Sequence, residues 1–209
     1  MYFYRPCSQE TRRAPTSIVL HCRRHPPLSP RTPGTPRPSA PSIPRQVRLE
    51  IPGAPLHITQ RGGNRCAILL DDDDRRHYLG LLGKSAATHG LRIHAYALIG
   101  NHMHLLVSSN ECGQLSMAMR QLGQAYVTAF NRRHRRTGIL WEGRFKSCLV
   151  DSDRYLLTAY RYIELNPIRA AMVEKLEHHH WPSVHANLAL CEDSLVTRTR
   201  ASLRWERHG

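Results

Sequence analysis

The segment Asn101-His102-Met103-His104-Leu105-Leu106-Val107 decides the fold that we expect for this chain. Its first residues alternate between polar and apolar, which is typical of a half-buried strand. Because successive side chains of a strand point to opposite faces, His102 and His104 project from the same face. Two neighbouring imidazoles on one face can bind a metal ion together.

The segments around this strand predict further strands. Leu56 to Arg61 alternates in the same way and is followed by the turn signal Gly62-Gly63-Asn64. Leu91 to Leu98 and His102 to Val107 predict the two strands of a hairpin around Ile99-Gly100-Asn101.

Three helices are expected in the rest of the patterned region. Arg75 to His89 has apolar residues at helical spacing, and Gly90 follows it at the position of a C-terminal cap. The four acids Asp71 to Asp74 are expected to cap the start of this helix, where negative charge is favourable. Gln114 to His134 predicts a second helix, and Asp153 to Asn166 predicts a third.

The segment between the last two helices, Trp141 to Val150, predicts a loop and a strand. One of Asp151, Ser152 and Asp153 is expected to cap the third helix, and Pro167 is expected to close it. The resulting order of strand, helix, hairpin, helix, strand and helix predicts an α+β domain with mostly antiparallel pairing.

Composition divides the chain into three parts. Residues 1–45 contain ten prolines, and their eight arginines against the single acid Glu10 supply +7 of the formal net charge of +14. We expect this segment to be disordered or polyproline-like. It is interpreted as a nucleic-acid-binding arm, a solvated extension or an upstream start assigned in error. One folded domain is expected over residues 46–182, with an irregular tail over 183–209.

The net charge of +14, from 30 Lys and Arg against 16 Asp and Glu, predicts a polyanionic partner without choosing between DNA, RNA and anionic lipid. No apolar run reaches the ~18 residues of a membrane span. The six cysteines form no Cys-x-x-Cys pair, which argues against a zinc knuckle or a disulfide framework. Reduced thiols in a cytoplasm are the simplest interpretation.

A second motif supplies a nucleophile. In the third predicted helix, Tyr162 and Asn166 lie one turn apart on a common face, so a hydroxyl and an amide lie side by side. Tyr155 and Tyr160 are alternative candidates for the nucleophile, but only Tyr162 is followed one helical turn later by an amide side chain, that of Asn166. A phenol titrates near ~10, so its activation requires a nearby base or a metal ion. Together, the two motifs predict a metal site that polarises a phosphodiester and a tyrosine that attacks it.

His102-Met103-His104 and the segment Arg161-Tyr162-Ile163-Glu164-Leu165-Asn166-Pro167-Ile168-Arg169-Ala170 resemble motifs of REP-associated tyrosine transposases, which are single-tyrosine relatives of the HUH endonucleases. The resemblance covers most of the chain from Arg45 to Pro182. It implies a ferredoxin-like sheet with helices on one face, and Mg²⁺ or Mn²⁺ held by His102, His104 and Asn166. Imidazole alone favours manganese over magnesium, and zinc also binds such a pair.

The resemblance also implies a reaction and a substrate. Tyr162 attacks single-stranded DNA, leaves a 5′-phosphotyrosine and a free 3′-hydroxyl, and rejoins strands by the reverse step. The implied substrate is a repeated extragenic palindrome, which folds into a hairpin, while monomer and two-fold dimer both stay open. Two alternatives are a non-catalytic DNA-binding repressor derived from such a transposase and a histidine-triad nucleotide hydrolase. Leu106 argues against the hydrolase, because it stands where the alternating histidines should continue.

Basic and aromatic residues predict the DNA-binding surface, because arginine contacts phosphate and aromatic rings stack on bases. For each basic residue, a solvated surface position is the alternative. His178-His179-His180 looks like a metal-binding tract, but its place beside Trp181-Pro182 argues against that role. The residues expected to contact DNA are Arg61, Asn64, Arg132, Arg133, Arg135, Arg144 and Lys146.

Overall fold

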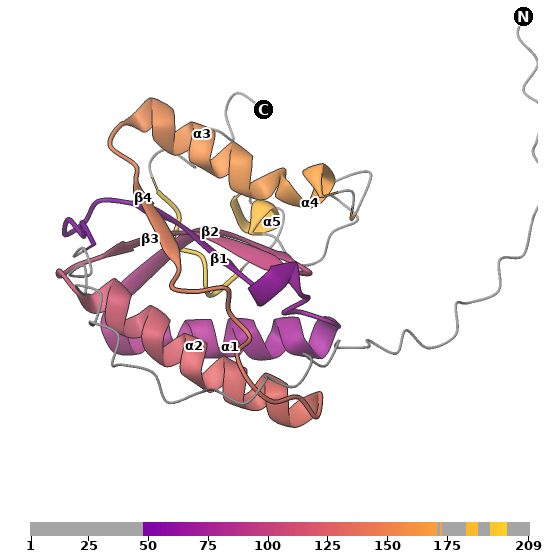
Figure 1. Ribbon diagram of the computed structural model, residues 1–209. Coiled ribbons are helices and arrows are strands. Elements are labelled where there is room, and N and C mark those ends of the chain that lie inside the picture. The colour runs from indigo at the N-terminus through magenta and orange to yellow at the C-terminus, as the bar shows by residue number, and fades with distance from the viewer. Residues whose placement is uncertain (1–47, 171, 173–182, 188–192, 200–209) are drawn as a thin grey trace, which may run out of the picture. The chain divides into compact units, whose positions relative to one another are not determined.

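Residues 48–170, 172, 183–187 and 193–199 are described by the computed structural model. Their centre is a four-stranded antiparallel sheet with the strand order β2-β3-β1-β4 (Figure 1). The expected α+β order is confirmed, and the strand ends differ from the expected ones by at most two residues in the first three strands. The strands are β1 (Leu56–Arg61), β2 (Leu91–Ile99), β3 (His102–Ser109) and β4 (Lys146–Leu149).

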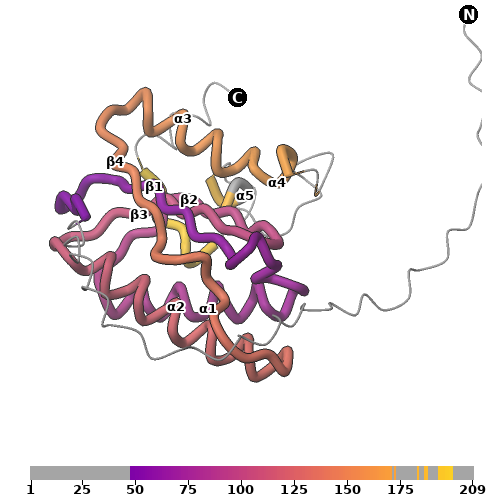
Figure 2. Tube along the Cα trace, viewed as in Figure 1, coloured from indigo at the N-terminus to yellow at the C-terminus, as the bar shows by residue number. Residues whose placement is uncertain are grey.

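The helices lie on both faces of this sheet, so the expectation of helices on one face was wrong. α1 (Asp72–His89) and α2 (Gln114–Arg133) cover one face (Figure 1). α3 (Asp153–Glu164) and α4 (Asn166–Arg169) cover the other, as the trace in Figure 2 also shows. Two short helices are described besides these: η1 (Gly63–Arg65) and α5 (Val184–Asn187).

The physical reason is that β2 and β3 carry apolar side chains on both faces. Under α1 and α2, Ile58, Met103 and Leu105 are fully buried and belong to one core with Tyr78 and Tyr126. A sheet that is apolar on its second face as well must bury that face against another element. Helices on both sides satisfy this requirement.

The second core lies under α3. The short side chains of Ala95 and Ala97 and the side chain of Leu106 form a buried cluster with Tyr160 and Ile163 of the helix. The helix presents its apolar residues at spacings of three and four, so it buries one stripe and exposes the rest. α3 is therefore packed over the same face from which the two imidazoles of β3 project.

Caps set the ends of the helices. Asp71 accepts a hydrogen bond from the Asp74 amide, so α1 begins three residues before the expected start, and the expected capping role of the acids is confirmed. Gly90 ends α1 in the left-handed conformation, with a φ of 61°, which glycine adopts without strain. Ser152 caps α3 by accepting a hydrogen bond from the Tyr155 amide.

α3 ends two residues before the expected end at Asn166. The reason is that Pro167 has no N–H with which to continue the hydrogen-bond ladder of the helix. Leu165 separates the two helices, and Asn166 and Pro167 open the one-turn helix α4. Because proline suits the first turn of a helix, Pro167 starts a new helix as well as ending the old one.

Two described parts of the segment expected to form an irregular tail contact the sheet. The Asn187 side-chain amide donates a hydrogen bond to the backbone carbonyl of His94, at 3.0 Å. The Thr197 amide donates to the Ile93 carbonyl, at 2.6 Å. Residues 193–199 therefore run along the outer edge of β2.

Two sequence predictions concern residues outside the described ones: the Pro-rich segment 1–45 and the tract His178-His179-His180. The boundaries expected for the folded domain, residues 46 and 182, also stay predictions. Within the described part of the chain, no helix combines the length and the apolar character needed to cross a membrane.

Candidate active site

The pairing of β1 with β3 gathers polar side chains on the face of the sheet that α3 covers. Thr59 lies opposite His104, and Arg61 lies opposite His102, in the antiparallel register. Residues that lie opposite each other point to the same face, and so do residues two apart in one strand. His57 therefore joins this group from β1. We call His57, Thr59, His102 and His104 the imidazole site.

His104 is the most deeply buried member of the imidazole site, with 4% of its surface exposed. Its Nδ1 lies 3.0 Å from His57 Nε2 and 3.2 Å from Thr59 Oγ1. Its Nε2 is buried and has no hydrogen-bond partner among the described residues. A buried polar atom without a partner costs about 1–3 kcal/mol, so this nitrogen is suited to a ligand that supplies one.

His102 is half-buried at the start of β3. Its Nδ1 lies 2.6 Å from Asn101 Oδ1, and the Asn166 side chain is a further hydrogen-bond partner. Asn166 is buried and reaches the imidazole from the first residue of α4. The structure thus brings Asn166 to the pair of histidines, as the sequence motifs predict.

Tyr162 projects from α3 against the same imidazoles. Its ring centroid lies 5.4 Å from that of His104 and 5.7 Å from that of His57, both in edge-on arrangements. The side chain is nevertheless 40% exposed, so a substrate can reach it. The guanidinium carbon of Arg169 lies 5.1 Å from the centroid of the tyrosine ring.

The two rival tyrosines are placed differently. Tyr160 is fully buried in the core under α3. Tyr155 is 39% exposed, but its hydroxyl lies 3.7 Å from Cys148 Sγ on β4. Of the three tyrosines of α3, Tyr162 is the one whose ring contacts the imidazole site.

Burial keeps the imidazoles uncharged. It lowers the pKa of His104 to about 3, with further lowering from the neighbouring His57, His102 and Arg61. Burial also lowers the pKa of His57 and of His102, and Arg61 adds to the effect on His102. Neutral imidazoles have a lone pair to offer, so protons do not compete with a metal ion for them near neutral pH.

The donor set fits a divalent cation. A histidine that binds a metal through one ring nitrogen usually places the other in a hydrogen bond with the protein. His104 has this arrangement, because its Nδ1 has partners and its buried Nε2 has none among the described residues. His102, His104 and Asn166 together offer two nitrogens and an amide oxygen, which suit manganese or zinc better than magnesium.

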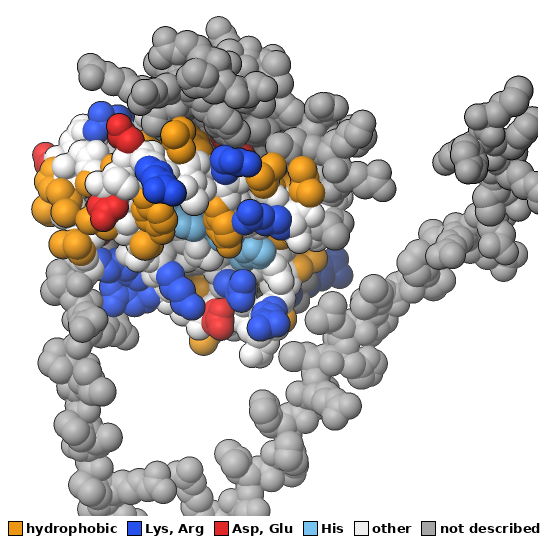
Figure 3. Space-filling view, turned by 90° about the horizontal axis from the view of Figure 1, so that it is seen from above, with side chains coloured by type: hydrophobic (Ala, Val, Ile, Leu, Met, Phe, Trp, Pro, Cys, Tyr) orange, Lys and Arg blue, Asp and Glu red, His pale blue; other side chains and the backbone are white. Residues whose placement is uncertain are grey.

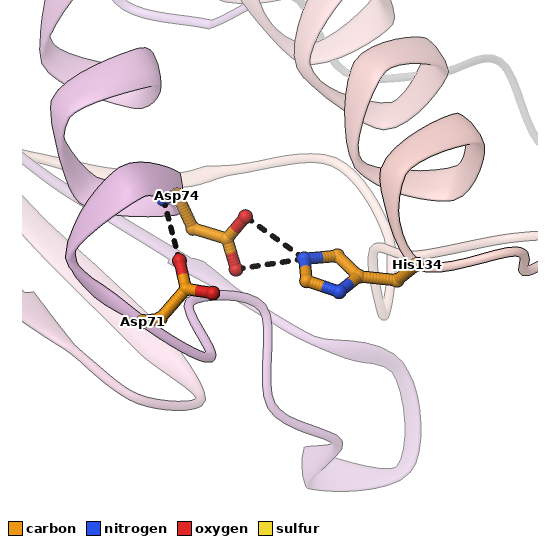
Figure 4. A group of neighbouring side chains, drawn as sticks. All are labelled: Asp71, Asp74 and His134. Atoms are coloured by element: carbon orange, nitrogen blue, oxygen red, sulfur yellow. Dashed lines mark hydrogen bonds and ion pairs between the residues drawn. The ribbon is translucent and has the colours of Figure 1, made fainter.

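A second polar group lies where α1 begins and α2 ends (Figure 4). Within the described residues, Asp71, Asp74 and His134 are the one set of three or more His, Cys, Asp and Glu side chains whose ligand atoms lie within 4.8 Å of one another. Arg133 forms ion pairs with both carboxylates, and the Leu70 amide donates a hydrogen bond to Asp74. We call Asp71, Asp74, Arg133 and His134 the carboxylate cluster.

The contacts of the carboxylate cluster indicate a structural role. His134 Nε2 lies 2.9 Å from Asp74 Oδ1, and the imidazole faces the carboxylate in Figure 4. The hydrogen bond from Arg133 is the main reason that the pKa of Asp71 falls to about 2. Because both carboxylates already accept hydrogen bonds from Arg133, and Asp74 also faces His134, the cluster ties α2 to the cap of α1 and has protein partners in place of a metal ion.

Four of the residues expected to contact DNA lie on, or within three residues of, strands β1 and β4. Arg61 belongs to the same sheet face, and Lys146 lies opposite Thr59 in β4. Asn64 is exposed on η1, and Arg144 is exposed in the loop before β4. Figure 3, which views the molecule from above Figure 1, shows several Lys and Arg side chains around exposed histidine surface.

The other three expected residues, Arg132, Arg133 and Arg135, lie at or just after the end of α2. This helix covers the opposite face of the sheet from α3. The Arg133 guanidinium is held by three carboxylates, those of Asp71, Asp73 and Asp74. Its charge is therefore already neutralised, whereas Arg132 and Arg135 are exposed.

Sequence reasoning does not identify His57 and Thr59 as members of the site. Both belong to the alternating stretch of β1, so the side of the strand on which they lie was readable. The alternating pattern does not predict that β1 pairs with β3, or that Thr59 lies opposite His104. The signal was a polar residue at every second position, His57, Thr59 and Arg61, on a strand whose other side begins with the apolar Leu56 and Ile58.

Comparisons with known proteins agree with this arrangement. A family model described as "Transposase IS200 like" matches residues 52–166, that is 115 of 209 residues and just over half of the chain. The matched range includes His102, His104, Tyr162 and Asn166. No curated protein sequence gives a match.

Two solved structures resemble this one. A REP-associated tyrosine transposase, solved bound to a REP hairpin, shares 19% sequence identity over 75% of this chain and 99% of that chain, with a TM-score of 0.60. A transposase candidate from Deinococcus radiodurans R1 shares 17% identity over 56% of this chain and 94% of that chain, and its TM-score of 0.41 carries no argument. The similarity to the REP-associated tyrosine transposase establishes the fold. Because the family model matches more than half of this chain, the chain belongs to the IS200-like transposase family.

Proposed function

We propose that this transposase cuts and rejoins single-stranded DNA, with Tyr162 as the nucleophile. The observation that carries the proposal is the contact between Tyr162 and His104, whose buried Nε2 has no partner among the described residues. A nucleophile and a nitrogen that can bind a metal ion are then placed to act on the same phosphate. The exposed 40% of Tyr162 leaves the side chain open to a DNA strand.

The metal ligands of this proposal are His102, His104 and Asn166, and the ion is Mn²⁺ or Mg²⁺. The nitrogen donors favour manganese among these two. When bound, such an ion acts as a Lewis acid that stabilises the charge developing on the oxygens of the scissile phosphate. His57 and Thr59 contact His104 Nδ1 and are not themselves ligands in this proposal.

The proposed reaction is a transesterification that needs no high-energy cofactor. The Tyr162 hydroxyl loses its proton, and its oxygen forms a bond to phosphorus. The bond between phosphorus and the 3′ oxygen of the preceding nucleotide breaks, and that oxygen takes up a proton. The products are a 5′-phosphotyrosine and a free 3′-hydroxyl. Attack by another 3′-hydroxyl on the phosphotyrosine reverses the step and joins two strands.

Basic residues around the site supply contacts for the DNA backbone. Arg61 lies opposite His102, and its buried Nε has no hydrogen-bond partner among the described residues, which favours a role in holding a phosphate. Lys146, Arg144 and Asn64 extend the positive or polar surface around it. A palindromic single strand that folds into a hairpin is the proposed substrate, because the transposase of similar fold was solved with a REP hairpin.

A covalent trap tests the proposed function. Purified protein is incubated with Mn²⁺ and a labelled single-stranded palindrome, and a denaturing gel is examined for a protein-DNA adduct. Tyr162→Phe is expected to abolish the adduct. Tyr155→Phe is the matched control, because Tyr155 lies on the same helix with 39% of its surface exposed, and it is expected to leave the adduct intact.

Other outcomes would change the conclusion. Binding of hairpins without any adduct, over a panel of palindromes and metals, would favour the non-catalytic repressor that the sequence left as an alternative. An adduct that persists in Tyr162→Phe would assign the nucleophile elsewhere. We place the reaction in the cytoplasm, where DNA is present and where the free Cys66, Cys112 and Cys148 stay reduced.

A further inference from the structure

We propose that His57 is a positioning residue that selects the metal-binding tautomer of His104. In this account, His104 carries its proton on Nδ1 and donates a hydrogen bond to His57 Nε2. The Nε2 lone pair of His104 then remains for the metal ion. The inference rests on the proposed function, because it assumes that His104 is a metal ligand.

The contacts of His104 leave two tautomers to compare. Its Nδ1 lies 3.0 Å from His57 Nε2, a distance at which one of the two nitrogens must donate and the other accept. If His57 donated, the proton of His104 would be on Nε2, which is buried without an acceptor among the described residues. The metal could not then bind there. If His104 donates, the same buried atom presents a lone pair, which a cation satisfies.

His57 is better placed than Thr59 to accept the hydrogen bond from His104 Nδ1. Thr59 Oγ1 lies 3.2 Å from the same Nδ1, the longer of the two distances. A hydroxyl also rotates and can donate as well as accept, so it does not specify the tautomer. His57 in addition contacts Tyr162, at 5.7 Å between ring centroids, so it touches both the ligand and the nucleophile.

The neighbouring ligand shows the same arrangement. His102 Nδ1 lies 2.6 Å from Asn101 Oδ1, and an amide oxygen only accepts hydrogen bonds. His102 therefore also carries its proton on Nδ1. One side-chain acceptor for each Nδ1, Asn101 for His102 and His57 for His104, leaves both Nε2 atoms unprotonated. The two imidazoles are thus prepared in the same way for a common ion.

Metal binding by variants of the full chain tests this inference without measuring catalysis. The dissociation constant for Mn²⁺ alone is determined by electron paramagnetic resonance, for the wild type and for three variants. His57→Phe keeps a ring against Tyr162 but cannot accept a hydrogen bond from His104. We expect it to bind Mn²⁺ about 10- to 100-fold more weakly than the wild type does. His57→Gln restores an acceptor oxygen and is expected to bind within about threefold of the wild type.

Thr59→Val is the matched control, because it removes the other contact of His104 Nδ1. We expect it to bind Mn²⁺ within about threefold of the wild type. Equal loss of binding in Thr59→Val, or wild-type binding in His57→Phe, would overturn the assignment of His57. All three variants are checked for folding by circular dichroism before the titration.

A second measurement decides the question even if His57→Phe fails to fold. Nitrogen chemical shifts of the histidines in the metal-free wild type report which ring nitrogen carries the proton. We expect Nδ1–H for His104, and Nε2–H would overturn the inference. The failure of the proposed function is distinguishable: wild-type protein that binds no Mn²⁺, or binds it equally well as His104→Ala, would refute the metal site itself and this inference with it.

Discussion

The imidazole site and the carboxylate cluster are both polar groups that join distant parts of the chain, but they differ in how completely they are satisfied. In the carboxylate cluster, the acids accept hydrogen bonds from Arg133, His134 and the Leu70 amide. In the imidazole site, the Nδ1 atoms have partners, while His104 Nε2 is buried with none among the described residues.

This difference separates structure from function. The protein itself completes the carboxylate cluster, which fastens the end of α2 to the cap of α1. In the imidazole site, His104 Nε2 is buried with no partner among the described residues, and the exposed Tyr162 lies against the same ring. Among the described residues, it is the carboxylate cluster whose Asp71, Asp74 and His134 have ligand atoms within 4.8 Å of one another, so closeness alone would favour it as a metal site. Whether each ligand atom already has a hydrogen-bond partner in the protein, arginine included, is the more informative criterion for a metal site.

The largest expected effect comes from comparing one histidine of each group. His102→Ala removes a proposed metal ligand, and we expect adduct formation to slow by at least about 1,000-fold, equivalent to about 4 kcal/mol. His134→Ala alters a histidine of the carboxylate cluster and is expected to leave the rate per folded molecule unchanged. Rates of adduct formation on a labelled palindrome measure both. Equal losses in the two variants would remove the distinction between the groups.

The next effect concerns stability and is expected only from the carboxylate cluster. Asp74 is 3% exposed and accepts hydrogen bonds from Arg133, His134 and Leu70. Asp74→Ala leaves these donors without their acceptor, and we expect the free energy of unfolding to fall by about 3 kcal/mol. Urea denaturation measures the loss. Added Mn²⁺ should not change the difference from wild type, and a Mn²⁺-dependent difference would show that the cluster binds the ion.

A buried carboxylate on α3 extends the comparison, because the side chains that hydrogen-bond to it are neutral. Glu164 is fully buried on α3 and accepts a hydrogen bond from the Asn187 amide, at 2.6 Å. Burial raises the pKa of Glu164 from its usual value near 4.5 to about 7. The folded protein therefore binds this proton more tightly than the unfolded chain does, which is opposite to the behaviour of Asp71.

The sign of this pKa shift sets the pH dependence. The contribution of Glu164 to stability is fully present below about pH 4.5 and is lost as the pH rises through about 7, with a size on the order of 3 kcal/mol. Glu164→Gln removes the titration, so it should become more stable than wild type above pH 7. Thermal unfolding of both proteins from pH 4 to 8 measures the difference, in which the contributions of the histidines cancel. A constant difference across this range would contradict the account.

The smallest expected effect separates free from neutralised arginines. Arg144 is exposed two residues before β4, whereas Arg133 forms ion pairs within the carboxylate cluster. Arg144→Ala should reduce the slope of log affinity against log salt by about 0.7 for single-stranded DNA, which corresponds to one lost phosphate contact. Arg133→Ala should leave that slope unchanged. Fluorescence anisotropy at several salt concentrations measures both, and a reversed order would move the DNA surface to the end of α2.

Much of the fold could be predicted because its signals are local. The alternation in Leu56–Arg61 and the turn after Ile99 identify β1 and the β2-β3 hairpin almost to the residue. Gly90 and Ser152 mark helix ends through caps that depend on neighbouring residues only. The side of the sheet on which α3 lies is not local, and a helical period does not reveal it. That is why the expectation of helices on one face was wrong.

The candidate site divides in the same way. His102, His104, Tyr162 and Asn166 belong to two compact motifs, and the structure brings all four together. His57 could not be recognised, because its role depends on the position of β1 beside β3. Arg133 was predicted to contact DNA, and the sequence pattern did not reveal its acidic partners, because they lie about 60 residues earlier in the chain.

Anomalous diffraction from crystals of the protein soaked in Mn²⁺ would locate the ion without reference to activity. We predict one strong peak beside Nε2 of His104, within reach of His102 and Asn166, and no peak at Asp71, Asp74 and His134. The same peak should be absent from crystals of His104→Ala. A peak in the carboxylate cluster, or no peak beside His104 in the wild type, would contradict the distinction between the two groups and the proposed metal-assisted chemistry of Tyr162.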